Sequence, residues 1–277
     1  MSRTSLNENS VCVAHSGLAY RQWGEGGNRP ILLLHGFMGS SRDWQPIAES
    51  LSRTHWVIAP DLPGHGCSHF AEPQQFTMQN AARLVVQLLD ELKIKRCACL
   101  GYSMGGRTAL YLAVHYPSRF ERVILESASP GLHTEQERAL RRRWDANIAE
   151  RLEVEPFQLF LESWYQMGLF DSFRAHKRFE QAFERRLDND PAQLAISMRQ
   201  MGTGSMPSLW GGWRQVENVV LIVGAFDQKY VGISAEMLTL NPTTVRHVLS
   251  QAGHNTHFEQ PAQFLLLIQP HLTNKPL

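Results

Sequence analysis

The pentapeptide Gly-Tyr-Ser-Met-Gly at 101–105 stands between two segments of opposite character. The run CACLG that ends on its first glycine suits a buried strand, and residues 105–115 before Pro117 suit a helix. A G-x-S-x-G sequence at a strand-to-helix turn is typical of a nucleophile elbow, whose glycines avoid side-chain clashes and whose serine is lifted above the sheet. We therefore take Ser103 as the candidate nucleophile. The alternative is a glycine-rich turn that merely exposes a serine.

Short apolar runs bounded by turn residues recur along the chain, at 30–36, 55–64, 97–101, 122–129 and 218–224. They are rich in Val, Ile and Leu and do not alternate with polar residues, which is typical of strands covered on both faces. Helical patterns lie between them, at 79–92 and 105–115. Strands that alternate with helices predict an α/β protein with a doubly wound, mostly parallel sheet.

The pattern changes between two of these strands. Residues 133–215 are mostly helical in pattern, contain no strand-like run, and carry many charges and aromatic side chains. We interpret them as a helical cap inserted into a core formed by 1–132 and 216–277. The stretch GTGSMPSLWGGW at 202–213 follows no pattern that we can assign.

A serine hydroxyl needs a neighbouring base before it can act as a nucleophile or take a proton. In α/β proteins with a nucleophile elbow, the two residues that act with the serine follow it along the chain in the order Asp, His. Asp227 lies just beyond the strand-like run at 218–224, and His254 follows the short apolar stretch VRHVL. Asp227 would orient the imidazole and His254 would exchange the proton with Ser103. Two alternatives remain: Asp227 as a turn residue, and His257 as the base.

A second glycine-containing loop, HGFMG at 35–39, follows the strand-like run at 30–36. An oxyanion hole needs one backbone N–H from this loop and one from the residue after the nucleophile, which nominates the amides of Phe37 and Met104. A third loop, DLPGHG, closes the next strand. The elbow and the two loops in this order predict the α/β-hydrolase fold. No metal site is expected, because the histidines near His254 have no metal-ligand spacing or accompanying carboxylate.

Composition limits the partners. The formal net charge of +1 excludes a strong field for nucleic acid or acidic membranes, and no run approaches the roughly 18 apolar residues that span a bilayer. The four cysteines form no CxxC pair and the first residues lack a signal-peptide core, so we expect a soluble, cytoplasmic protein. Arginine outnumbers lysine by 22 to 5, and arginine grips carboxylates in a fixed plane. These arginines could bind an anion or form a solvated surface.

Seven runs together resemble one family, the MenH family of 2-succinyl-6-hydroxy-2,4-cyclohexadiene-1-carboxylate synthases. They are LHGFMGSSRDW, DLPGHGCS, GYSMGGRTALYLA, ESASPGL, SWYQMGLF, GAFDQKY and AGHNTHFEQP, and they extend from about Pro30 to Pro261. The resemblance implies a lyase that eliminates pyruvate from 2-succinyl-5-enolpyruvyl-6-hydroxy-3-cyclohexene-1-carboxylate without a cofactor, in menaquinone or phylloquinone biosynthesis. Serine at the elbow excludes dehalogenases and epoxide hydrolases, and a serine hydrolase (esterase or carbon–carbon hydrolase) is the alternative function.

The resemblance also implies roles for single residues. Ser103, Asp227 and His254 form the triad, which removes a ring proton without an acyl-enzyme. The implied substrate contacts are Tyr102, Arg107, Arg141, Trp164, Arg186 and Lys229. Arg185 could replace Arg186, because the match around it is poor. The expected partner is a small polycarboxylate substrate, with no nucleic acid or membrane, and the chain would be a monomer or a weak homo-oligomer.

Overall fold

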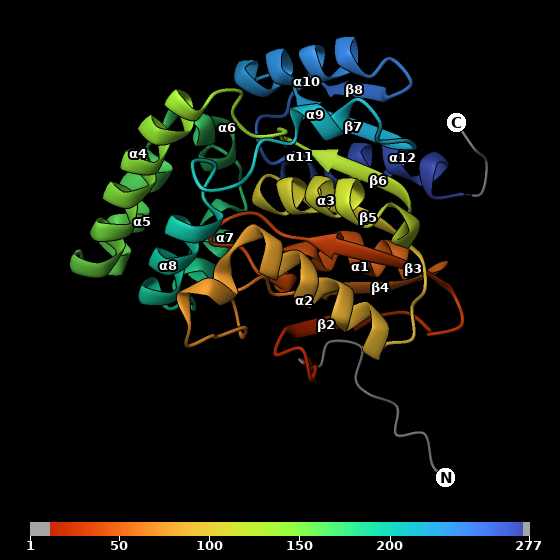
Figure 1. The fold of residues 1–277 in the computed structure, drawn as a ribbon, viewed down its shortest axis with the longest axis horizontal. Helices are drawn as coiled ribbons and strands as arrows, with labels where there is room; N and C mark the ends of the chain where they lie inside the picture. The colour runs from red at the N-terminus through yellow and green to blue at the C-terminus, as the bar shows by residue number, and fades with distance from the viewer. Residues whose placement is uncertain (1–11, 274–277) are drawn as a thin grey trace.

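The computed structural model describes residues 12–273, and an eight-stranded sheet forms its centre (Figure 1). The strand order is β1-β2-β4-β3-β5-β6-β7-β8; β3 to β8 are parallel, whereas β1 and β2 extend one edge in antiparallel fashion. The mostly parallel sheet predicted from the sequence is therefore confirmed. Its strands are β1 (Cys12–Val13), β2 (Ala19–Trp23), β3 (Arg29–Leu34), β4 (His55–Pro60), β5 (Cys97–Tyr102), β6 (Phe120–Glu126), β7 (Val219–Gly224) and β8 (Val245–Leu249).

Helices cover both faces of the sheet, as the unbroken apolar strands require. One face packs against α2 (Met78–Glu91), α3 (Met104–His115), α9 (Trp210–Trp213) and α10 (Gln228–Leu240). The other packs against α1 (Gln45–Leu51) and α12 (Pro261–Leu272). The remaining short elements outside residues 133–215 are α11 (Thr256–Glu259) and the 3-10 helices η1 (Ser41–Trp44), η2 (Pro73–Phe76) and η3 (Pro117–Arg119).

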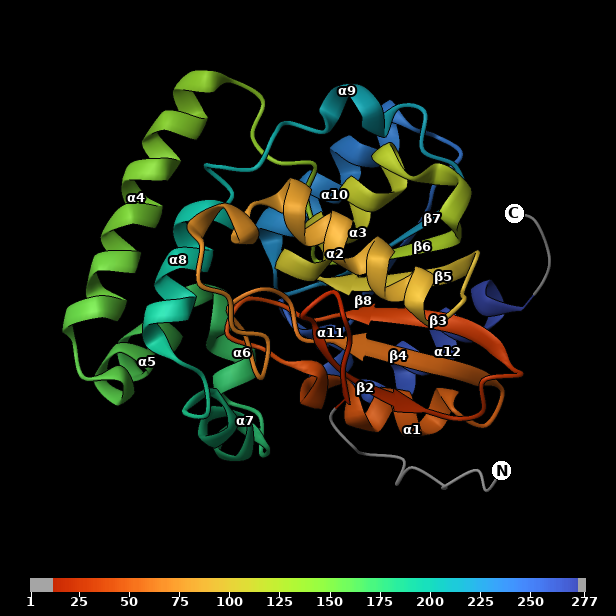
Figure 2. The ribbon, with the colours of Figure 1, turned by 60° about the horizontal axis from the view of Figure 1, so that its bottom comes forward.

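Strands β6 and β7 pair side by side, although about ninety residues separate them along the chain. The intervening segment forms α4 (Glu135–Val154), α5 (Phe157–Tyr165), η4 (Gly168–Phe170), α6 (Asp171–Arg174), α7 (Phe179–Arg186), α8 (Pro191–Met201) and α9. Apart from α9, these helices lie beyond the carboxyl ends of the parallel strands (Figures 1 and 2). They pack around an apolar cluster that also takes in Met38 and Phe258 from the sheet unit. These helices therefore face the carboxyl ends of the strands, where we predicted the site from the sequence.

The stretch 202–213, which fitted no sequence pattern, fills the space between α4 and the sheet unit. A Cβ on Gly204 would lie 2.5 Å from the backbone N of Arg142, so only glycine permits this approach to α4. At the other end of the stretch, Trp213 Nε1 donates to the carbonyl of Met237 over 2.8 Å. Close packing therefore accounts for Gly204 and Trp213 in this stretch.

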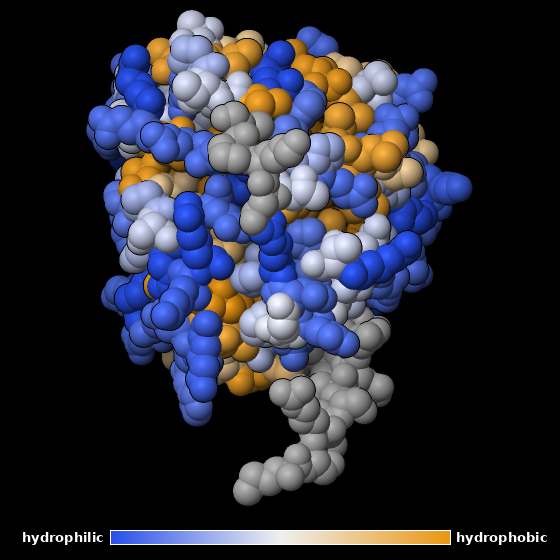
Figure 3. Space-filling model, turned by 90° about the vertical axis from the view of Figure 1, so that its right-hand side faces the viewer, coloured by the Kyte–Doolittle hydropathy of each residue, from blue (hydrophilic) through white to orange (hydrophobic). Residues whose placement is uncertain are grey.

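The face of the molecule opposite α4 and α5 shows hydrophilic and hydrophobic residues mixed over its surface (Figure 3). Among residues 12–273, no helix combines the length and apolar character that crossing a bilayer requires.

Candidate active site

Ser103 sits in a strained turn at the end of β5. Its φ of 51° lies in the left-handed region, which side-chain-bearing residues rarely adopt. The turn is tight because β5 and α3 nearly touch: a Cβ on Gly101 would lie 2.2 Å from the carbonyl oxygen of Gly105, and one on Gly105 would lie 2.1 Å from that of Leu34. Glycine at both positions is therefore a steric requirement, and the turn holds Ser103 at the rim of the sheet.

Three side chains from different strand ends are joined by hydrogen bonds at this rim. His254 Nε2 lies 3.0 Å from Ser103 Oγ, and His254 Nδ1 lies 2.6 Å from Asp227 Oδ2. His254 and Asp227 are both buried. A carboxylate accepts, so Nδ1 carries the proton and Nε2 can accept from the Ser103 hydroxyl. The arrangement therefore has the connectivity that proton transfer from serine requires.

The structure also bears on the two alternative assignments, Asp227 as a turn residue and His257 as the base. Asp227 does act as a turn residue, because it caps α10 by accepting from the backbone N of Tyr230, while its other oxygen holds His254. His257 bonds elsewhere: its Nδ1 lies 2.7 Å from Glu126 Oε2, and its ring stacks on Trp44 with centroids 4.1 Å apart. His254 is therefore the histidine that reaches Ser103.

The loop that follows β3 lies beside Ser103. Phe37 and Met104 line the same cavity as Ser103, and among residues 12–273 neither backbone amide donates a hydrogen bond to a protein acceptor. Met38 adopts a φ of 60°, and Asn189 Nδ2, from the loop after α7, donates to its carbonyl oxygen over 3.0 Å. Two backbone donors are thus free next to the serine: that of Met104 at the start of α3, and that of Phe37 in a loop to which Asn189 of the helical segment bonds.

One cavity contains every side chain that the sequence nominated for substrate contact. Its wall includes Ser103 and His254 at one end, while Asp227 stays behind His254 outside it. The nominated residues on its wall are Tyr102, Arg107, Arg141, Trp164, Arg186 and Lys229. Arg185 is not among the lining residues, and its guanidinium instead lies 3.6 Å from Asp43.

Three of the cations on this wall are close enough to affect one another. Burial, together with Arg141, lowers the pKa of Lys229, and burial followed by the neighbouring Arg141 also lowers the pKa of Arg107. Among residues 12–273, neither Arg107 nor Lys229 has a carboxylate at ion-pair distance, and Arg107 Nε has no hydrogen-bond partner. Arg141 is paired with Asp145, with Nε 2.7 Å from Oδ1. Cations gathered in this way favour an anionic ligand.

Arg186 has a different environment. Its side chain is 7% exposed, its guanidinium lies 2.8 Å from the Asp43 carboxylate, and its Nε donates to Tyr165 Oη over 3.2 Å. Burial alone would raise the pKa of Asp43, but the charge and hydrogen bonds of Arg186 hold it below its usual value. Arg186 thus ties α7 to η1, directly after the loop that carries Phe37.

Two aromatic side chains complete the wall. The Tyr102 ring lies between His254 and His257, with centroids 5.4 Å and 5.2 Å away. The Trp164 ring meets Phe37 edge-on at 5.7 Å. These rings add apolar surface to the wall of the cavity.

The sequence reasoning missed the acidic and hydroxyl partners of the arginines. Asp145 follows Arg141 at i+4 on α4, a spacing that could have identified the pair. Asp43 closes a capping box with Ser40, a local signal for a helix start but not for an ion pair with a residue 143 positions away. Within the described part of the chain, no group of three or more His, Cys, Asp or Glu side chains could hold a metal ion.

Comparison with known proteins agrees with this geometry. A family model described as the alpha/beta hydrolase fold matches residues 29–261. A putative 2-succinyl-6-hydroxy-2,4-cyclohexadiene-1-carboxylate synthase of Bacillus subtilis is 33% identical over 93% of this chain and 96% of its own length. Protein PHYLLO, chloroplastic, of Arabidopsis thaliana is 32% identical over 87% of this chain, which spans only 15% of that protein.

A solved structure adds the same result. MenH from S. aureus has a TM-score of 0.87 and 31% identity, over 91% of this chain and 97% of that chain. The match therefore includes residues 133–215 as well as the sheet unit. The chain therefore belongs to the α/β-hydrolase fold and, within it, to the family of 2-succinyl-6-hydroxy-2,4-cyclohexadiene-1-carboxylate synthases (MenH).

Proposed function

We propose that this chain is a lyase of menaquinone or phylloquinone biosynthesis, which converts 2-succinyl-5-enolpyruvyl-6-hydroxy-3-cyclohexene-1-carboxylate to 2-succinyl-6-hydroxy-2,4-cyclohexadiene-1-carboxylate and pyruvate. One observation carries the proposal: Ser103, bonded to His254, shares a cavity with the cations Arg107, Arg141 and Lys229. The substrate carries three carboxylates, and the relative from Bacillus subtilis is named for the product.

The bond changes follow from the two chemical names. The ring double bond at carbon 3 becomes double bonds at carbons 2 and 4, so a proton leaves carbon 2 and the enolpyruvyl oxygen leaves carbon 5. Ser103 Oγ, whose proton passes to His254, takes the proton beside the succinyl ketone. The freed electron pair forms the new double bonds and breaks the carbon–oxygen bond, and the departing enolpyruvate takes up a proton to become pyruvate. No water is consumed and no acyl-enzyme forms.

Each remaining group stabilises charge. As the proton leaves, negative charge spreads to the ketone oxygen, where the amides of Phe37 and Met104 can donate to it. Asp227 keeps Nδ1 of His254 protonated and so stabilises the imidazolium. The guanidinium groups can bind carboxylates through paired hydrogen bonds, which a point charge such as Lys229 cannot do.

Arg186 and the aromatic residues Tyr102 and Trp164 belong to the proposal as substrate contacts. Arg186 lies on the wall of the cavity, although its charge is already balanced by Asp43. We also propose that 133–215 act as a cap on a core of 1–132 and 216–277, since β6 and β7 pair across that insertion. A monomeric or weakly associating, cytoplasmic protein with no nucleic acid or membrane partner stays a prediction from the sequence.

The test is to supply the unstable substrate, made in place by the enzyme that forms it, and to measure pyruvate release above the spontaneous rate. We expect a large acceleration, and we expect Ser103→Ala to lower kcat by about 10³-fold while leaving the melting temperature near that of the unchanged protein. A matched control is Ser250→Ala, a serine in the turn after β8.

The outcomes separate the two functions. Acceleration that disappears in Ser103→Ala supports the lyase. Absence of acceleration, together with turnover of simple aryl esters, would assign the chain to the serine hydrolases. Acceleration that persists in Ser103→Ala would remove the triad from the mechanism.

A further inference from the structure

Glu126, the last residue of β6, is a fully buried carboxylate that the proposed reaction does not use. Its side chain is 0% exposed. Burying an ionised carboxylate costs free energy unless hydrogen bonds or a paired charge replace its water. The question is therefore which groups surround it and what they hold.

The carboxylate of Glu126 receives three donors, all from the segment that carries the candidate base. Oε1 accepts from Thr256 Oγ1 at 2.7 Å and from the backbone N of His257 at 2.9 Å. Oε2 lies 2.7 Å from His257 Nδ1. These donors come two and three residues after His254, across a sequence separation of about 130 residues.

The main chain of Glu126 holds the other partner of the reaction. Its carbonyl oxygen accepts from the backbone N of Ser103 at 2.8 Å, and Glu126 pairs with Tyr102 at the last position of the β5–β6 ladder. One residue thus contacts the elbow through its backbone and the histidine loop through its side chain. Both contacts lie within three residues of the reacting atoms.

A second carboxylate supports the same loop locally. Glu259 accepts from the amides on both sides of His254, with Gly253 N at 2.8 Å and Asn255 N at 3.2 Å. Glu259 lies on α11, in the same segment as His254, so its bonds shape that segment but do not link it to the strand end that carries Ser103. Glu126 lies on the sheet and can do so.

We propose that Glu126 is a positioning residue, which sets the separation of Ser103 and His254 by bonding the elbow through its carbonyl and residues 256 and 257 through its carboxylate. This inference rests on the proposed role of Ser103 and His254. A shift of about 1 Å at reacting groups can cost about a hundredfold in rate, so loss of the carboxylate should affect reactivity more than binding.

The test measures the reactivity of Ser103 directly. A fluorophosphonate probe reacts with a serine that a histidine activates, and the assay needs no natural substrate. We expect Glu126→Ala to lower the rate of phosphonylation about a hundredfold. We expect Glu126→Gln to stay within about fivefold, because its carbonyl can keep two donors and its NH₂ can donate to His257 in the other tautomer.

The matched control is Asn241→Ala. Asn241 is also a buried polar side chain that bonds two backbone groups, the carbonyls of Trp213 and Val216, but it lies away from the cavity. Its loss should lower the melting temperature and leave phosphonylation unchanged. Equal slowing in Asn241→Ala and Glu126→Ala, or normal reactivity in Glu126→Ala, would overturn the proposal.

Two further measurements keep the result interpretable. If Glu126→Ala does not fold, Thr256→Val replaces it as the test, because it removes one hydrogen-bond donor to the Glu126 carboxylate. Phosphonylation that is three- to tenfold slower would support the proposal. An unchanged rate would overturn it. In pyruvate release, Glu126→Ala should lower kcat with KM changed less than threefold. An unaltered protein that is phosphonylated rapidly but releases no pyruvate would overturn the proposed lyase and leave the test of Glu126 intact.

Discussion

Two cationic regions of the cavity wall differ in how their charge is balanced. At the junction of α7 and η1, Arg186 is buried against the carboxylate of Asp43 and the hydroxyl of Tyr165. On the wall formed by α3 and the start of α10, Arg107 and Lys229 lack carboxylates at ion-pair distance among the described residues. Both regions border the same cavity.

This difference in charge balance indicates that the two regions make different contributions to stability and binding. A buried ion pair whose hydrogen bonds are complete fixes one segment against another, and removing one partner leaves the other charge uncompensated. Arg107 is buried with no carboxylate at ion-pair distance among the described residues, and burial lowers its pKa, so its charge is costly to keep, whereas the nearby Lys229 is exposed. An anionic substrate would relieve that cost. We therefore expect the junction to contribute to stability as well as to the cavity wall, and the open wall to contribute mainly to binding.

The largest effect is expected at the junction. Arg186→Ala should lower the free energy of unfolding by about 3–5 kcal/mol, because Asp43 would lose its hydrogen-bonded cation and keep only Arg185, whose Nε lies 3.6 Å away. Urea or thermal unfolding measures this. Asp43→Asn combined with Arg186→Met should recover much of the lost stability. An unchanged free energy of unfolding in Arg186→Ala would show that the junction does not stabilise the fold.

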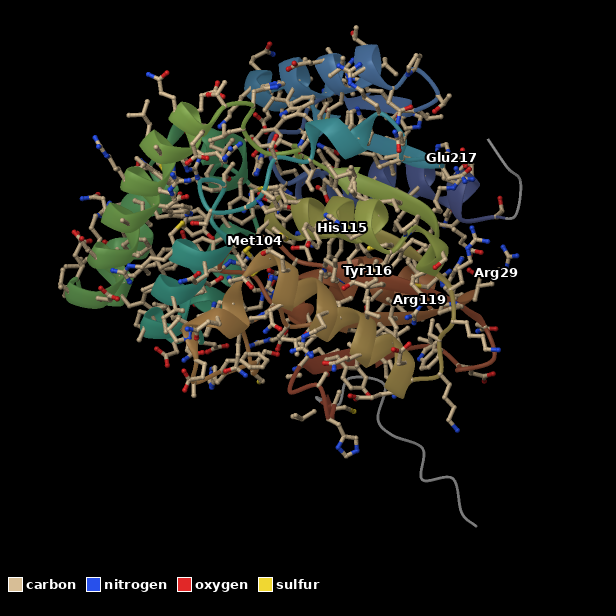
Figure 4. The ribbon with its side chains drawn as sticks, viewed as in Figure 1. Arg29, Met104, His115, Tyr116, Arg119 and Glu217 are labelled. Atoms are coloured by element: carbon tan, nitrogen blue, oxygen red, sulfur yellow. The ribbon has the colours of Figure 1, made fainter. Side chains whose placement is uncertain are left out.

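The next effect is expected on the open wall. Arg107→Ala should lower kcat/KM for pyruvate release by about 10- to 150-fold, equivalent to a charge-assisted contact of about 1.5–3 kcal/mol, with little loss of stability. Steady-state kinetics measures this. The matched control is Arg119→Ala, which removes an arginine on the opposite side of the molecule, near Arg29 and away from Met104 (Figure 4). Equal kinetics for Arg107→Ala and the unchanged protein would remove Arg107 from the site.

The smallest effect is a dependence of stability on pH near the junction. Burial lowers the pKa of His35, and burial followed by His35 lowers that of His65 well below its usual value. The unfolded chain therefore binds more protons below about pH 6.5, so this stability is present above pH 6.5 and is lost as the pH falls.

Melting curves at pH 7.5 and pH 5 measure this effect. His65→Asn should reduce the loss of stability between these values by about 1–2 kcal/mol. A variant that loses as much stability on acidification as the unchanged protein would show that His65 does not contribute.

Local patterns predicted much of the fold. The apolar runs became β3 to β7, and the glycines around Ser103 mark a turn that only glycine permits. The antiparallel β1 and β2 were not predicted, because AYRQW mixes polar and apolar residues as an edge strand can. The roles assigned to single residues stay predictions, although Ser103, Asp227 and His254 are joined by hydrogen bonds.

By itself, the sequence determined the sheet type, and it predicted the serine at the elbow and the order, Asp then His, in which its partners follow. These depend on hydrophobic period and turn chemistry, which act over a few residues. Only the tertiary structure decided that Arg186 and not Arg185 faces the cavity, that Asp43 balances it, and that Glu126 holds the segment after His254. Such pairings join residues more than a hundred positions apart, and a buried charge selects its partner by distance in space once the chain has packed.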